Sequence, residues 1–198
     1  FGSTLKNVGE INNKGIEIEL GSDIINKNDW KWSLSLNGSA IKNTVTKLYG
    51  KQEIIWNDPT GGDSRTRYVY REGEDYLSYF GLEWAGTNQE NGKNMWFVND
   101  ENDAAAGDFQ IDGRGATYTY TKANRKIIGS AHPKWYGGIN SDLDYKGLSL
   151  GLNFTYKIGG KIYDSASRDV ADDGYYWERI HAQYFVDESW SPSNPTGD

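Results

Sequence analysis

Cysteine is absent from the 198-residue sequence, and histidine, methionine and proline are scarce, with 2, 1 and 4 residues. Without cysteine there is no disulfide framework, no thiol nucleophile and no thiolate ligand for a metal. Two histidines, His132 and His181, are too few for a multi-histidine metal site and give little support to a catalytic triad. We therefore expect structural or solvated roles for both histidines, and neither a cofactor nor a metal.

Long apolar runs are missing as well. No run approaches the ~18 residues of a membrane helix, which excludes a helical membrane protein, and the mean hydropathy is −0.77. The net charge of −7 argues against nucleic-acid binding, because phosphate recognition needs clustered Lys and Arg. The chain is instead rich in Gly (24), Tyr (14) and Trp (8), a composition typical of β-structure.

Apolar and polar residues alternate with a period of two, which predicts two-faced β-strands. We expect strands over residues 16–25, 30–40, 135–145, 148–163 and 178–186, and ATYTYT (116–121) is a further, short strand candidate. In the longest of these, one face carries Leu148, Leu150, Leu152, Phe154, Tyr156, Ile158 and Ile162. Its other face carries Ser149, Asn153, Thr155, Lys157 and Lys161.

Two hairpins are expected. A two-residue turn at Lys146-Gly147 would pair Tyr145 with Leu148 and Trp135 with Ile158, which keeps every pair on the apolar face. A five-residue turn over 25–29 would pair Ile24 with Trp30. That second register would set Leu20 against Leu34 and Ile18 against Leu36.

Pattern alone favours a soluble β-sandwich, in which the apolar faces pack together. Length favours a membrane barrel, because alternation over residues 148–162 exceeds the usual ~5–6 residues of a strand and matches the ~9–11 tilted residues that cross a bilayer. Trp30, Trp32 and Tyr145 near the predicted turns also suit the aromatic belt of a membrane interface.

No residue set marks an enzyme. Glu83 and Glu178, each beside a tryptophan, are the nearest candidates for a glycosidase acid, but solvated or lumen-facing charges are the stronger interpretation. The acidic run over 99–103 could offer oxygen ligands to calcium, although a solvated loop is favoured. The stretch 112–115, Asp-Gly-Arg-Gly, is interpreted as a turn and not as a phosphate cradle.

Aromatic residues outside the regular strands are candidates for contact with a ligand or a partner protein, since their faces stack against sugar rings and other apolar groups. Packing within the loops is the alternative. The candidates are Trp56, Trp84, Trp96, Tyr175, Tyr176 and Trp177.

Several segments resemble the SusC/RagA family of TonB-dependent outer-membrane receptors. NVGEINNKGIEIEL (7–20) is similar to a strand motif of TonB-dependent barrels, and FGLEWAG (80–86) resembles the family's aromatic-glycine segment. The most specific match is residues 127–164, IIGSAHPKWYGGINSDLDYKGLSLGLNFTYKIGGKIYD, and WSPSNPTG (190–197) is similar to a segment before the last strands. The stretch 107–113 departs from the family's calcium-like loop, which puts calcium there in doubt.

The resemblance implies an all-β fold, an antiparallel up-and-down meander within a barrel of about 22 strands. Long extracellular loops would span about 49–126 and 164–177, and the plug domain would lie outside this chain. Leu34, Leu36, Leu148, Leu150, Leu152 and Phe154 would face lipid.

The same resemblance implies location in the bacterial outer membrane and active import of oligosaccharides or peptides. The implied partners are TonB, which acts through a plug region, and a SusD-like surface lipoprotein. The alternatives are a soluble β-sandwich carbohydrate-binding module and a fragment of a glycoside hydrolase.

Overall fold

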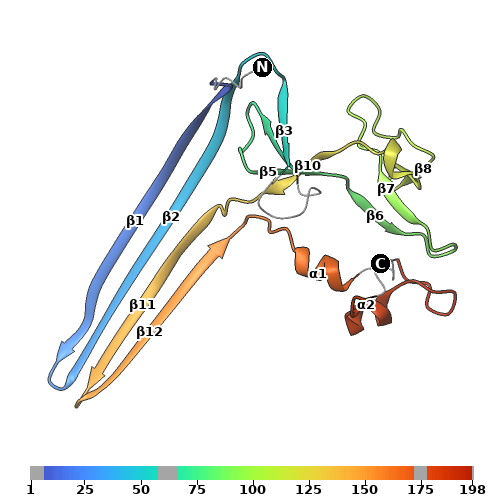
Figure 1. Ribbon diagram of the computed structural model, residues 1–198. Coiled ribbons are helices and arrows are strands. Elements are labelled where there is room, and N and C mark those ends of the chain that lie inside the picture. The colour runs from blue at the N-terminus through green and yellow to red at the C-terminus, as the bar shows by residue number, and fades with distance from the viewer. Residues whose placement is uncertain (1–6, 58–66, 172–177, 198) are drawn as a thin grey trace. The chain divides into compact units, whose positions relative to one another are not determined.

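The computed structural model describes residues 7–57, 67–171 and 178–197 (Figure 1). The chain divides into two compact units, which are considered separately. The first comprises Phe1–Tyr79 and Gly129–Lys161, and the second comprises Phe80–Ile128 and Ile162–Asp198. Among the described residues, no helix has both the length and the apolar character to cross a membrane.

Four long antiparallel strands dominate the first unit, in the order β1-β2-β11-β12. They are β1 (Gly9–Lys27), β2 (Trp30–Leu48), β11 (Trp135–Tyr145) and β12 (Leu148–Ile158). The first two have 19 residues each and the last two have 11. All four reach the length that a tilted strand needs to cross a bilayer, ~9–11 residues.

The hairpin of β11 and β12 has the predicted register. Tyr145 pairs with Leu148 and Trp135 with Ile158, as the alternation indicated. The two turn residues both have positive φ, 47° at Lys146 and 85° at Gly147. This is the backbone of a type I′ turn, whose twist matches that of the strands.

The predicted register of the first hairpin is wrong. Lys27 pairs with Trp30, so the turn has two residues instead of five, and Leu20 lies opposite Leu36. Asn28 enters the turn with a φ of 56°, which asparagine tolerates better than most residues. A bulge between Asp23 and Ile25 restores the alternation of faces.

The β2–β11 pairing joins the two hairpins into one sheet. Trp30 stacks on Tyr145 with ring centroids 4.1 Å apart, and the Trp32 indole N–H donates to Ser141 Oγ over 2.9 Å. Both contacts lie on a face whose apolar side chains are largely exposed. The more than half-exposed members include Ile16, Ile18, Leu20, Leu148, Leu150, Phe154 and Ile158.

The opposite face of this sheet is polar and internally hydrogen-bonded. The Asn153 amide donates to Asn140 Oδ1, and the Asn140 amide donates to Ser35 Oγ over 3.1 Å. These bonds link β12, β11 and β2 in one row. The structure therefore assigns apolar and polar side chains to opposite faces, as the sequence predicted.

A row of two glycines and a tyrosine crosses the same three strands on the apolar face. Gly38, Gly137 and Tyr156 are register neighbours, and the Tyr156 hydroxyl donates to the backbone oxygen of Asn37 over 3.3 Å. A Cβ at Gly137 would lie 2.1 Å from that same oxygen and 2.7 Å from the Tyr156 hydroxyl. Because Gly38 and Gly137 have no side chains, the Tyr156 ring can lie across the neighbouring strands without a steric clash.

Short strands form two further sheets. One has the order β10-β5-β4-β3 and the other β6-β7-β9-β8. Their members are β3 (Glu53–Asn57), β4 (Arg67–Arg71), β5 (Ser78–Gly81), β6 (Trp84–Thr87), β7 (Asn94–Phe97), β8 (Phe109–Ile111), β9 (Arg114–Thr117) and β10 (Lys126–Ser130). The span 49–126, expected as loop, therefore contains ordered β-structure in its described parts.

Helical structure replaces strand in two predicted places. The strand expected over 178–186 is absent, and Gln183–Glu188 forms α2, in which Phe185 and Val186 N–H groups donate to the Ala182 carbonyl. The strand candidate over 116–121 ends at Thr117 and is followed by the 3-10 turn η1 (Tyr120–Lys122). Both patterns were short, and short alternation is a weak strand signal.

One further boundary of a predicted strand also differs, and the loop expected after it contains a helix. The strand expected to reach residue 163 ends at Ile158, because Gly159 and Gly160 both adopt positive φ, 77° and 83°. Beyond it, α1 (Ser165–Val170) begins at the Asp164 cap, whose Oδ1 accepts the Ser167 N–H over 2.9 Å.

The fully buried side chains are small in both units, although Leu48 and Phe80 are also largely buried. Val45 and Val69 are at most 2% exposed in the first unit, as are Ala116 and Thr117 in the second. With so little apolar burial, polar contacts contribute strongly to holding the short strands.

An ion-pair network around Glu83 holds the second unit. The Arg114 guanidinium binds both carboxylate oxygens of Glu83 and lies 3.6 Å from the centroid of the Phe97 ring. Lys126 Nζ lies 2.6 Å from the same carboxylate. The hydrogen bond from Arg114 is the main reason that the pKa of Glu83 falls from 4.5 to about 2, and the hydrogen bond from Lys126 lowers it further. Partial burial acts in the opposite direction.

Replacing Gly137 by alanine should destabilise the barrel, because the new methyl group would meet the Asn37 carbonyl. Overpacking of this kind costs about 1–3 kcal/mol. The thermal midpoint of the intact receptor, followed by heat-dependent gel mobility, should fall. Gly21→Ala is the matched control, since its Cβ would meet nothing closer than 3.8 Å. Equal midpoints for both variants would contradict the steric role of the glycine row.

Acid should loosen the second unit through Glu83. Because the pKa of Glu83 is lowered in the folded state, its ion pairs stabilise the second unit fully above pH 4.5. This contribution to the free energy of unfolding is lost as the pH falls toward 2. Amide exchange at Phe97, whose N–H donates to the Glu83 carbonyl, should accelerate over that window after correction for intrinsic rates. Glu83→Gln should flatten the response, whereas Glu90→Gln, at an exposed loop position, should leave it intact. A response unchanged in Glu83→Gln would rule out this carboxylate as its source.

Candidate functional site

Three aromatic rings form a row across β3, β4 and β5. Trp56 pairs with Tyr68, and Tyr68 pairs with Tyr79, so the side chains share one face. The rings stack with centroid separations of 5.6 Å and 5.0 Å. Trp56, at the end of the row, is 37% exposed. Such a row can offer an apolar ring face to a ligand while its other members hold the tryptophan in place.

Trp84 and Trp96 form a second aromatic position, on β6 and β7 of the second unit. The two residues are direct register partners. Trp84 is 44% exposed, and its indole N–H donates to Asn94 Oδ1 over 3.3 Å. Trp96 is half-buried and also pairs with Thr117. Trp84 is therefore the member that is more available for contact.

The remaining aromatic candidates, Tyr175, Tyr176 and Trp177, lie outside the described residues. Trp56 belongs to the first unit, and Trp84 and Trp96 belong to the second. The structure thus places the described candidates in two local arrangements, and their contact with a ligand stays a prediction.

The residues predicted to face lipid lie on the exposed apolar face. Leu148, Leu150, Leu152 and Phe154 are 43–73% exposed, and Leu36 is 39% exposed. Leu34 is half-buried on the same face of β2. Exposed leucines in a continuous patch are what a lipid-contacting surface requires.

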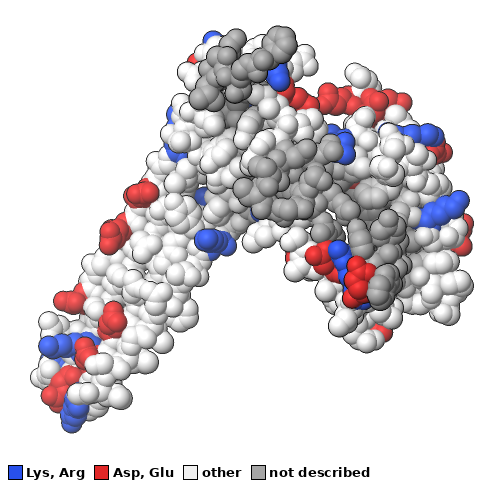
Figure 2. All heavy atoms as spheres, in the orientation of Figure 1, with Lys and Arg blue, Asp and Glu red and all other residues white. Residues whose placement is uncertain are grey.

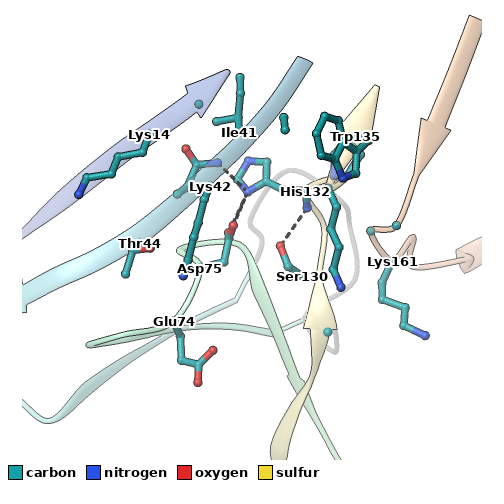
Figure 3. Close-up of a pocket in the computed structure, with 18 of the residues that line it drawn as sticks. Lys14, Ile41, Lys42, Thr44, Glu74, Asp75, Ser130, His132, Trp135 and Lys161 are labelled. Carbon is teal, nitrogen blue, oxygen red and sulfur yellow. Dashed lines mark hydrogen bonds and ion pairs between the residues drawn. The ribbon is translucent and has the colours of Figure 1, made fainter. Parts of the chain in front are cut away.

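His132 has a structural role in the first unit. Its Nδ1 lies 2.8 Å and 3.0 Å from the two carboxylate oxygens of Asp75, and the Asn43 amide lies 3.2 Å from it (Figure 3). Its ring also meets Tyr76 edge-on, with centroids 4.9 Å apart. Sequence reasoning missed Asp75 and Asn43 because both are far from His132 along the chain.

His181 lies outside any strand, contrary to the expected strand position. Its ring lies edge-on to Phe185, with centroids 6.2 Å apart. The change follows from the helix at 183–188, which removes the alternation on which the expectation rested.

The carboxylates considered for catalysis or calcium binding have other partners or are exposed. Glu83 was expected to be a solvated or lumen-facing charge; its carboxylate is paired with Arg114 and Lys126, which keeps it ionised and unsuited to proton donation. Glu178 is exposed. Asp100 Oδ1 accepts the Asn102 and Asp103 N–H groups, as expected of a loop.

No group of three or more potential metal ligands occurs among the described residues. In the stretch 107–113, Asp108 accepts from Thr117 and forms an ion pair with Lys122 at 2.8 Å. Of the turn expected over 112–115, only Asp112 and Gly113, both of positive φ, form a turn, because Ile111 pairs with Arg114 and β9 begins there.

No family model matches the chain. TonB-dependent receptor P3 of Formosa agariphila is 30% identical over 200 residues, which cover 99% of this chain and 19% of the relative. TonB-dependent receptor P26 of the same organism is 28% identical, over 100% of this chain and 20% of the relative. The chain thus spans about a fifth of the length of the curated relatives it matches.

Solved structures show the same fold. The RagAB peptide transporter matches all of this chain and 21% of its own chain, with a TM-score of 0.80 and 22% identity. The RagAB peptide importer in its open-open state matches all of this chain and 20% of its own, with a TM-score of 0.76 and 25% identity. The chain therefore belongs to the TonB-dependent receptors of the outer membrane and forms part of the β-barrel of a SusC/RagA-type member.

Proposed function

We propose that this chain supplies part of the wall and outer loops of a transporter that imports oligosaccharides or peptides with energy delivered by TonB. The observation that carries the proposal is the two-faced sheet, which is apolar and exposed on one side and hydrogen-bonded and polar on the other. A wall between lipid and an aqueous lumen needs this division. Membership of a family named as receptors, and likeness to a peptide transporter, support the same function and give no support to an enzyme.

The soluble β-sandwich is the weaker alternative. A sandwich buries its apolar faces against a second sheet, yet Leu148 is 73% exposed and Ile16 is 63% exposed. Side chains as apolar as Leu148 and Ile16 stay uncovered by protein only where another apolar medium surrounds them. Lipid is that medium in the proposed function.

The two-residue turns give the sheet an orientation within the membrane. In bacterial barrels short turns are periplasmic and long connections are extracellular. The turns at 28–29 and 146–147 would then face the periplasm, at the end of the sheet where Figure 2 shows charged side chains of both signs. The span 49–126, with Trp56, Trp84 and Trp96, would lie outside the cell, where a SusD-like lipoprotein or an arriving substrate could contact it.

Cysteine scanning at two adjacent positions tests the outward apolar face. A fluorophore on Leu152→Cys in the intact receptor should be quenched strongly by bromine-labelled lipid. The same fluorophore on Asn153→Cys should not be, because that side chain lies on the polar face. Shielding of position 152 from both lipid and water would favour the sandwich, and quenching at position 153 alone would reverse the two faces.

Uptake measurements test the aromatic candidates. Trp56→Ala and Trp84→Ala should each reduce substrate uptake or lipoprotein capture about 5–30-fold, the effect of losing a contact of about 1–2 kcal/mol. Barrel folding should be unchanged. Tyr120→Ala is the control, since Tyr120 is 62% exposed and lies on neither aromatic arrangement. If uptake and capture by both tryptophan variants match the control, the aromatics only pack within their loops.

A further inference from the structure

The segment 190–197, which we call the latch, follows α2 at the red end of the chain and contacts the turn between β6 and β7 (Figure 1). The latch and the turn both belong to the second unit. The Trp190 indole N–H donates to the Gln89 carbonyl over 2.8 Å, and the Thr87 N–H donates to the Gly197 carbonyl over 2.8 Å. The latch therefore reaches the end of β6 as well as the turn that follows it.

Two glycines give the latch its close fit. A Cβ at Gly92, where φ is 71°, would lie 2.5 Å from Cε3 of the Trp190 ring. A Cβ at Gly86, where φ is 95°, would lie 2.9 Å from the Gly197 oxygen. Both positions thus need glycine for the backbone conformation and again for space. As a result, the Trp190 ring lies directly against the backbone of the turn.

The latch has hydrogen bonds of its own that do not involve the β6–β7 hairpin. Ser191 and Asn194 exchange backbone hydrogen bonds of 3.0 Å and 2.9 Å. The Asn194 amide donates to the Asp187 carbonyl over 3.0 Å, and the Thr196 hydroxyl donates to the Glu188 carbonyl over 2.8 Å. These bonds fold the latch against the end of α2. It is therefore a preformed piece, whose contact with the hairpin costs little further ordering.

One residue pair connects the latch to Trp84. Thr87 pairs with Asn94 across the hairpin, and Asn94 Oδ1 accepts the Trp84 indole N–H over 3.3 Å. The register shifts between Trp84 and Thr87, and irregularities of this kind change the direction of nearby side chains. The direction of the Trp84 indole therefore depends on Asn94, and Asn94 is held by the residue that the latch contacts.

Burial makes the contact at Thr87 important. Thr87 is 7% exposed, and a buried N–H without a partner costs more than the hydrogen bond itself contributes. If the latch opens, the Thr87 N–H reaches water only when this part of the hairpin moves. On the other side of the turn, the Asn88 amide donates to the Tyr118 hydroxyl over 2.9 Å. That bond does not involve the latch, so it keeps the turn attached while the latch is open.

We propose that the latch sets the direction in which the Trp84 ring faces a ligand, with Trp190 as the positioning residue. The closed latch pairs the Thr87 N–H, holds Asn94 through the strand pairing and so fixes the Trp84 indole, which is 44% exposed. A ring that is already held loses less freedom when a ligand binds. The ligand contact of Trp84 rests on the proposed function, whereas closure of the latch does not.

Amide exchange in the intact receptor, without ligand, measures closure of the latch. Trp190→Ala should speed exchange at Thr87 about tenfold, because one hydrogen bond and the contact with Gly92 are lost together. Trp190→Phe keeps a ring against Gly92 and should give a smaller increase. Exchange at Phe97, whose N–H donates to the Glu83 carbonyl, should stay unchanged, because this bond lies beyond the latch.

A pair of glycine variants tests the same contact independently. Gly92→Ala should also speed exchange at Thr87, since the new methyl group would displace the Trp190 ring. Gly113→Ala is the matched control, because φ at Gly113 is 78° in the same unit, yet a Cβ there would meet nothing within 4 Å. It introduces similar backbone strain without touching the latch.

Hydroxyl-radical footprinting of the same receptors, read by mass spectrometry, measures the positioning of Trp84. Trp84 should oxidise faster in Trp190→Ala than in the wild type, and at an intermediate rate in Trp190→Phe. Trp56, 37% exposed in the first unit, is the internal reference. Asn94→Ala cuts the connection, so adding Trp190→Ala to it should cause no further change at Trp84.

The proposal fails if Thr87 exchanges at the wild-type rate in Trp190→Ala, or if Gly92→Ala and Gly113→Ala have equal effects. Equally faster exchange at Phe97 would reduce the effect to a general loosening of the second unit. An unchanged oxidation rate of Trp84 in Trp190→Ala would remove the positioning role. Should Trp190→Ala not fold, Trp190→Phe and the glycine pair decide alone. None of these outcomes depends on uptake, so they are separate from the tests of the proposed function.

Discussion

The pairing of β2 with β11 is the constraint on which the rest of the structure depends. It brings together residues far apart in the sequence, such as Trp32 and Ser141, which are 109 positions apart. Inside lipid every backbone N–H and C=O needs a partner, so this edge cannot remain open. The chain between Leu48 and Trp135 must therefore leave and re-enter the barrel wall at neighbouring strands. Its short strands form under this constraint on the two ends. Closing so long a loop also costs more conformational entropy than closing either two-residue hairpin.

The faces of the long strands could be predicted from the sequence, whereas one of their registers could not. Alternation fixes which side a residue occupies, and it correctly assigned Leu148, Leu150, Leu152 and Phe154 to the apolar face. It also fixed the hairpin at Lys146-Gly147, where the turn residues are unambiguous. In the first hairpin the pairing away from the turn is shifted by two residues, which leaves every face unchanged. The hydrophobic pattern therefore cannot detect that error, and only the positive φ at Asn28 and the nearby bulge decide the register.

The short elements and the polar contacts were less accessible from sequence. Residues 183–188 alternate briefly but form a helix, because a few residues of pattern do not outweigh local turn formation. The ion pairs of Glu83, expected as a solvated or lumen-facing charge, could not be predicted, since Arg114 and Lys126 are distant in the chain and meet it only in the fold. By contrast, the aromatic candidates could be named from composition, although the stacking of Trp56 on Tyr68 and Tyr79 required the structure.

The length of β1 and β2 has a mechanical consequence. Nineteen residues of strand extend about 60 Å at ~3.3 Å per residue, whereas the apolar band of an outer-membrane barrel is about 25 Å tall. Even when tilted, the two strands must continue well beyond the bilayer as one antiparallel ribbon, with irregular pairing at Glu10/Ile11 near its outer end. A ribbon of this kind resists bending far better than a flexible linker does. A displacement of its outer end is therefore transmitted to the barrel wall, because little of the movement is absorbed by bending of the ribbon.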